Sequence, residues 1–286
     1  MELLTDQIIE KVNTFPTVRP IADKVIKLCS QAESSTPELL KIISSDPILT
    51  VQLLRIANAY YFSYPRMISS IDRAVIVLGF NLVKELTLMI ALISFFRKTD
   101  NKYHFHHHKI WKHSILTGVA MKVLGEIYDS KNKDLLYIGG LLHDLGKTVL
   151  CQTIQDEYYL LLQKSIQEKR PLHIIEKKYL NFDHAEIGAK LIKQWNLPIG
   201  IELMVCFHHK PITYREKDRN SLWIKLIYLG NVLIHSLENT ENEEPINNED
   251  KSFIKEYFSF SDKEIEKTKS IIKREIQAQK SLLEFL

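Results

Sequence analysis

The sequence predicts an all-α protein. Only nine glycines and nine prolines occur in 286 residues, and such a composition favours long helices over a loop-rich or all-β design. Hydrophobic residues make up 45% of the chain, which is enough for the core of one large domain or of two closely packed ones. Apolar residues recur at helical spacing, and in the first hundred residues no strand-like alternation competes with them.

The first hundred residues are predicted to form a bundle of about five short helices. Thr36 and Asp46 each precede a proline, and this order is typical of an N-cap followed by the first helical position. Ser69, with Asp72 three residues later, resembles a capping box ahead of an apolar run. Gly79 then ends that helix.

Longer helices are predicted in the second half, beyond a polar stretch at 97–103. They cover residues 111–127, 134–142, 156–168, 183–195, 199–208 and 222–237. The acidic, Asn-rich stretch at 238–250 is predicted to be a solvated loop, and a charged helix is predicted from Ser261. We therefore divide the chain into an N-terminal bundle at 1–100, a second helical domain at 101–240 and a C-terminal part at 241–286.

Charge and cysteine content limit the classes of function. The formal net charge is only +3, and no basic stripe is present for phosphate contacts, so DNA is not an expected partner. Cys29, Cys151 and Cys206 form no CxxC pair and predict reduced thiols in a cytoplasmic protein. The N-terminus lacks the pattern of a signal peptide, and the longest apolar run, 86–96, is too short to span a membrane.

The segment GGLLHDLGK at 139–147 is the richest candidate for chemistry. An imidazole and a carboxylate side by side, at His143 and Asp144, can both turn toward one cation. Nitrogen and oxygen ligands together suit Fe, Mn, Co, Ni or Zn. Lys147 follows and could hold a phosphate oxygen as a point charge.

This segment, with His113 in WKHS upstream, resembles the HD superfamily of metal-dependent phosphohydrolases. A second resemblance lies earlier in the chain. LLRIANAYYF at 53–62, a proline at 65, ISSIDRA at 68–74 and the pair Leu78-Gly79 are similar to the HDOD family, the HD-related output domain of bacterial signalling proteins. Together the two matches cover roughly residues 10–235, and they imply a helical bundle packed on an HD-type helical domain.

The downstream half resembles the HD-GYP branch, whose sites hold two or more metals. DHAEIGA at 183–189 and FHHKP at 207–211 look like its remaining histidine motifs. The resemblance implies one or two divalent ions and these ligands: His113, His143, Asp144, His184, His208 and His209.

Two departures from this pattern weaken the case for catalysis. The last aspartate of the superfamily falls at about Asn231, whose neutral amide oxygen binds or bridges metals less well than a carboxylate. The Gly-Tyr-Pro motif is missing after His209, which argues against hydrolysis of cyclic di-GMP.

Other histidines have simpler interpretations. His113 taken alone would more often be a partly buried histidine than a ligand, and only the matched pattern reverses this. His173 and His235 are interpreted as structural. The tract of His104, His106, His107 and His108 is predicted to be a solvated loop, because no orienting partner is evident.

Two functions remain open. In the first, the chain is a bacterial regulatory protein that contacts a protein partner through its N-terminal bundle and binds metal with little or no catalysis. In the second, it is a metal-dependent phosphohydrolase acting on a nucleotide or phosphodiester. Asp144 would then hold the metal that generates hydroxide, and Lys147 would stabilise charge on the phosphate.

Overall fold

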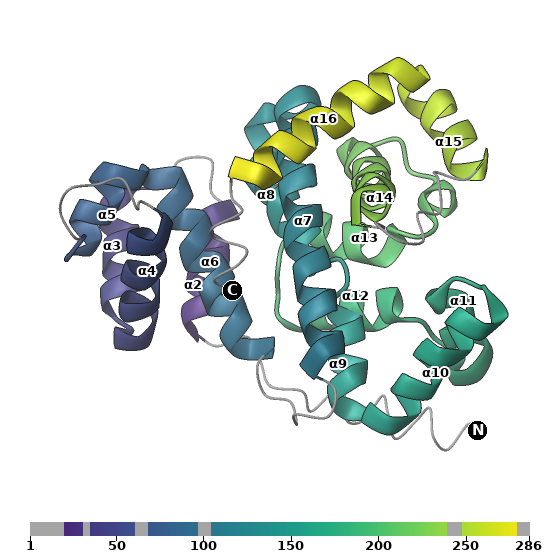
Figure 1. Ribbon diagram of the computed structural model, residues 1–286, viewed down its shortest axis with the longest axis horizontal. Coiled ribbons are helices and arrows are strands. Elements are labelled where there is room, and N and C mark those ends of the chain that lie inside the picture. The colour runs from purple at the N-terminus through teal and green to yellow at the C-terminus, as the bar shows by residue number, and fades with distance from the viewer. Residues whose placement is uncertain (1–19, 31–34, 61–67, 97–103, 239–247, 279–286) are drawn as a thin grey trace. The chain divides into compact units, whose positions relative to one another are not determined.

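A computed structural model of the chain describes residues 20–30, 35–60, 68–96, 104–238 and 248–278 (Figure 1). These residues form helices joined by short turns, with no strand among them. The all-α fold class is therefore confirmed. None of the helices in these ranges is both long enough and apolar enough to cross a membrane. The N-terminal segment and the polar stretch at 97–103 lie outside the described residues.

The described helices form two compact units. The first unit contains five helices, as expected: α2 (Pro20–Ser30), α3 (Thr36–Ser44), α4 (Pro47–Tyr60), α5 (Ile71–Leu78) and α6 (Phe80–Phe96). Their core includes Val25, Ile26, Leu39, Leu53 and Leu86, which have at most 1% of their surface exposed.

Two helix boundaries of this unit follow the prediction. Asp46 accepts a hydrogen bond from the backbone N–H of Leu49 at 3.1 Å, and Gly79, with a φ of 85°, ends α5. Two caps were predicted one residue away. Ser35 rather than Thr36 caps α3, and Ser70 rather than Ser69 caps α5. In both places two hydroxyl residues adjoin, so only the backbone turn decides which one caps.

The second unit contains ten α-helices among the residues described. They are α7 (His104–Tyr128), α8 (Lys133–Leu142), α9 (Leu145–Thr153), α10 (Gln155–Glu168), α11 (Leu172–Leu180), α12 (His184–Gln194), α13 (Ile199–Phe207), α14 (Arg219–Glu238), α15 (Asn248–Phe258) and α16 (Asp262–Ala278). Two 3₁₀ turns, Ser130–Asn132 and Pro211–Thr213, complete it.

Three predictions about this unit were incomplete or wrong. Helices α9, α11 and α15 were not predicted. The histidine tract at 104–108 is not a loop but the first turn of α7, because no glycine or proline interrupts the chain there. The stretch expected to be a loop at 238–250 gives its first residue to α14 and its last three to α15; residues 239–247 lie outside the described part.

Glycines allow the helices around the HD pair to approach closely. A Cβ on Gly140 would lie 2.6 Å from the Cα of Gly118, where α8 packs on α7. A Cβ on Gly146 would lie 1.9 Å from the carbonyl oxygen of His184, where α9 packs on α12. The second contact brings the start of α12 directly beside Asp144.

Candidate metal centre

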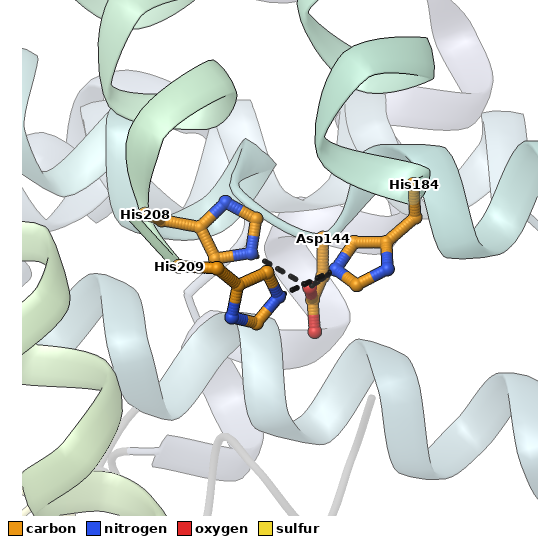
Figure 2. A group of neighbouring side chains, drawn as sticks. All are labelled: Asp144, His184, His208 and His209. Atoms are coloured by element: carbon orange, nitrogen blue, oxygen red, sulfur yellow. Dashed lines mark hydrogen bonds and ion pairs between the residues drawn. The ribbon is translucent and has the colours of Figure 1, made fainter. Parts of the chain in front are cut away.

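Four side chains from three helix ends converge in the second unit. Asp144 lies at the junction of α8 and α9, His184 is the first residue of α12, and His208 and His209 follow α13. One ligand-type atom from each lies within 4.8 Å of the others. Figure 2 shows the four side chains pointing toward one another. We call these four residues the buried centre.

Distances within the buried centre are those of groups that face one point. Oδ1 of Asp144 lies 3.3 Å from Nε2 of His184 and 3.6 Å from Nε2 of His208. Nε2 of His209 lies 2.9 Å from Nε2 of His184. His143 borders the group, with its Nε2 3.5 Å from Oδ2 of Asp144.

Several of these buried atoms have no hydrogen-bond partner. They are Nε2 of His143, Oδ1 of Asp144 and Nε2 of His208, on side chains that are at most 2% exposed. A buried polar atom without a partner costs about 1–3 kcal/mol, and more if it is charged. Oδ1 of Asp144 and Nε2 of His208 lie in the buried centre and fit a cation, because each offers a lone pair, while Nε2 of His143 borders the centre.

The opposite ring nitrogens of His143 and His208 are anchored. Nδ1 of His143 donates to the carbonyl oxygen of Gly140 at 2.8 Å, and Nδ1 of His208 donates to that of Val205 at 2.7 Å. When Nδ1 carries the proton, Nε2 of a neutral ring keeps its lone pair. This arrangement is typical of metal-ligating histidines.

His184 is anchored by a carboxylate instead. Its Nδ1 lies 2.6 Å from Oε2 of Glu176, a residue of α11 with no exposed surface. The same oxygen accepts the backbone N–H of His184 at 2.8 Å, and Tyr158 donates its hydroxyl to Oε1. The charge of Glu176 is thereby directed at His184.

The protonation states suit a cation site. Burial lowers the pKa of His143, His208 and His209, so these rings are neutral at pH 7. Burial alone would raise the pKa of Asp144, but interactions with His143 and the Lys147 ammonium outweigh it, and the pKa lies well below its usual range. Burial also opposes charge on His184, yet the Glu176 carboxylate raises its pKa to about 9.

Lys147 forms an ion pair with Asp144. Its Nζ donates to Oδ2 of Asp144 at 2.6 Å, one turn along α9. This ion pair leaves Oδ1 as the carboxylate oxygen directed at the histidines of the buried centre.

His113 and Asn231 form a separate pair. Nε2 of His113 lies 2.8 Å from Oδ1 of Asn231, and its Nδ1 lies 2.6 Å from Oε2 of Glu238. A ligand atom of His113 still lies within 4.8 Å of atoms of His143 and Asp144. The structure thus brings Asp144, His184, His208 and His209 together, with His143 beside them, and joins Asn231 to His113.

Four residues that the sequence did not assign to a site lie beside the predicted histidines. Glu176 and Glu238 carry no motif of their own, and they meet their histidines only through folding. His173 and His235, which were interpreted as structural, stack on histidines of the predicted set: His173 on His209 at 4.1 Å between ring centroids, and His235 on His113 at 4.5 Å.

Comparison with known proteins shows which family has this sequence pattern. The HDOD domain family matches residues 15–211. The chain belongs to the HDOD domain family. This confirms the resemblance noted in the sequence.

Solved structures share the fold. An HDOD domain protein of unknown function from Geobacter sulfurreducens superposes with a TM-score of 0.76 and 22% identity, over 98% of this chain and 95% of that one. A protein of Shewanella amazonensis SB2B, named "Putative phosphohydrolase", has a TM-score of 0.71 and 16% identity over 97% and 96% of the two chains.

A relative from Treponema pallidum (strain Nichols), named only as an uncharacterized protein, is 24% identical over 209 residues. The match takes in 72% of this chain and 40% of the relative. The chain therefore spans well under half the length of that relative.

Proposed function

We propose that this HDOD protein is a bacterial regulatory protein that binds one divalent metal ion at the buried centre, with slow or no turnover. The observation that supports it best is that Oδ1 of Asp144 and Nε2 of His208, 3.6 Å apart within the buried centre, have no hydrogen bond. Buried polar atoms in folded proteins almost always have partners. An ion would supply one to both atoms.

The donor set narrows the ion. Imidazole nitrogens with one carboxylate oxygen favour Fe, Mn, Co, Ni or Zn over Ca or Mg, which prefer oxygen ligands. When bound, the ion would balance the charge of Asp144 and join α9, α12 and the end of α13. Because it would bind the folded form, it would also stabilise that form.

A single ion is favoured over a pair by two contacts. Lys147 occupies Oδ2 of Asp144, so the carboxylate has one oxygen left and does not bridge. Oδ1 of Asn231 is hydrogen-bonded to Nε2 of His113, and the superfamily pattern would place an aspartate at position 231. Two-metal hydrolysis depends on ligands that hold both ions about 3.5–4 Å apart, and these contacts argue against it.

The regulatory part of the proposal rests on the family. The HDOD resemblance implies a signalling output module, and the bundle of α2–α6 would then be the surface for a protein partner. A nucleotide is a further candidate ligand of the second unit. An affinity-capture experiment tests this surface. Substitution of an exposed bundle residue such as Arg73 should remove the captured partner, whereas Lys193→Ala in the second unit should leave capture unchanged.

The alternative function is a metal-dependent phosphohydrolase acting on a nucleotide or phosphodiester. The nearly complete histidine set and the position of Lys147 favour it, and the name of the Shewanella protein is in line with it. Asn231→Asp tests whether this position has been altered away from catalysis. If only the missing carboxylate prevents turnover, this variant should gain phosphodiester hydrolysis that the wild type lacks.

A thermal unfolding experiment tests the main proposal. Wild-type protein stripped with chelator should gain stability when Mn²⁺, Zn²⁺ or Co²⁺ is added, whereas His208→Ala should gain little. His108→Ala, an exposed histidine on α7, serves as the matched control. Equal stabilisation of wild type and His208→Ala would contradict binding at this centre, and wild-type turnover of a phosphodiester panel would support the enzyme instead.

A further inference from the structure

A second group of metal-type ligands lies at the end of α14. His113 of α7 and His235 and Glu238 of α14 each place one ligand-type atom within 4.8 Å of the other two. None of the three belongs to the buried centre. We call them the outer group.

The spacing on α14 explains how the group forms. Asn231, His235 and Glu238 follow one another at intervals of four and three residues, so they lie on one face of the helix. That face packs on α7, where His113 meets all three: Asn231 and Glu238 through its ring nitrogens, and His235 through a stacked ring.

The ring of His113 lies between two side-chain oxygens of α14. Both ring nitrogens face an oxygen, Oδ1 of Asn231 at 2.8 Å and Oε2 of Glu238 at 2.6 Å. A neutral ring carries one N–H. With that N–H on Nε2, toward the Asn231 oxygen, the lone pair of Nδ1 and the Glu238 carboxylate would both be available to a cation.

Solvent exposure distinguishes the outer group from the buried centre. His113 is buried, Glu238 is partly exposed and His235 is exposed. A hydrated ion can therefore reach the group without an opening of the helices. The exposed His235 side chain can also turn about its own bonds toward an ion.

From these contacts we propose that His113, His235 and Glu238 bind a second divalent cation, separate from the ion of the buried centre. Two imidazoles and one carboxylate form a ligand set typical of Zn²⁺, Co²⁺, Ni²⁺ or Fe²⁺, with water completing the coordination. Ligand atoms about 2.1 Å from a tetrahedral ion lie roughly 3.4 Å apart, so Nδ1 of His113 and Oε2 of Glu238, now 2.6 Å apart, would separate slightly on binding. Asn231 orients the ring of His113 and is not itself a ligand.

The test is a calorimetric titration of the full, metal-stripped chain with Zn²⁺. Wild type is expected to bind two ions, the outer one more weakly because water completes its shell. His235→Ala and Glu238→Gln should each lose one ion and keep the other. His184→Ala should keep the outer ion and lose the buried one, and His108→Ala should keep both.

Each outcome decides the proposal. If His235→Ala and Glu238→Gln both still bind two ions, the proposal is overturned. It is also overturned if the wild type binds a single ion that disappears in His184→Ala but persists in His235→Ala. The last result leaves the proposed function intact. A single ion that disappears in His235→Ala and persists in His184→Ala would support the outer group and contradict the buried centre. Circular dichroism of each variant checks that the helices remain folded.

Discussion

Glu176 holds His184 by two contacts, 2.6 Å from its ring Nδ1 and 2.8 Å from its backbone nitrogen. The pair has no exposed surface. The contacts fix both the ring and the start of α12, so that Nε2 is directed at Asp144. A carboxylate behind a histidine also makes that histidine a stronger ligand.

Glu176→Gln should weaken metal binding at the buried centre by about 10–100-fold, the usual effect of losing such an orienting carboxylate. The neutral amide of the Gln side chain would not balance the positive charge that a bound ion induces on the His184 ring. Competition with a chromophoric chelator measures the affinity. Glu157→Gln, an exposed residue of α10, is the control; equal affinities in the two variants would contradict the role given to Glu176.

Metal binding at pH 7 should release about one proton for each ion at the buried centre. The Glu176 carboxylate, opposing the effect of burial, raises the pKa of His184 to about 9, so its ring is charged at pH 7 and must lose the proton on Nε2. The pKa of His208 and of His209 is lowered by burial, and these rings release none. Titrations in buffers of different ionisation enthalpy count the protons, best in His235→Ala so that only this centre contributes. A count of zero would show that His184 is not a ligand.

The stability of the metal-free protein should be greatest near pH 6.5. Burial holds the pKa of His143 well below that of the unfolded chain, 6.5, so acidification below pH 6.5 protonates the unfolded state first and stability falls. The raised pKa of His184, about 9, has the opposite sign: its contribution is complete below pH 6.5 and is lost as the pH rises toward 9.

Urea unfolding between pH 5 and 9 measures both limbs, and one proton gives a slope of at most about 1.4 kcal/mol per pH unit. The alkaline limb should flatten in Glu176→Gln. A wild type that grows more stable from pH 6.5 to 9 would contradict this account of His184.

Gly146→Ala should destabilise the protein by at least about 1–3 kcal/mol, the usual cost of overpacking. The added Cβ would lie 1.9 Å from the backbone carbonyl oxygen of His184, and two helices must separate to admit it. Gly230→Ala is the control, since its Cβ would meet only side chains, those of Met121 at 3.3 Å and Leu124 at 3.6 Å. Equal free energies of unfolding for the two variants would show that the contact of α9 with α12 is not tight.

Much of this structure was predictable because it is local. Apolar periodicity marked most helices, and the cap at Asp46 and the stop at Gly79 follow from the chemistry of single residues. The histidine tract at 104–108 was not recognised as helix, because repeated polar residues hide the periodicity that marks one.

The buried centre could be predicted only in part. The HD and histidine motifs identified Asp144, His184, His208 and His209, but nothing near Glu176 distinguishes it from other helical glutamates. Its partner Tyr158 is 18 residues away, and Glu238 meets His113 across 125 residues. Such pairs are defined by helix packing, which a single sequence does not specify.

The central claim, a divalent ion at the buried centre, is tested most directly by anomalous diffraction from crystals grown with Mn²⁺ or Zn²⁺. The account predicts an anomalous peak within coordination distance of Oδ1 of Asp144 and Nε2 of His184 and His208, and its loss in crystals of His208→Ala. A well-ordered wild-type crystal with no peak among these atoms, at millimolar metal, would contradict it.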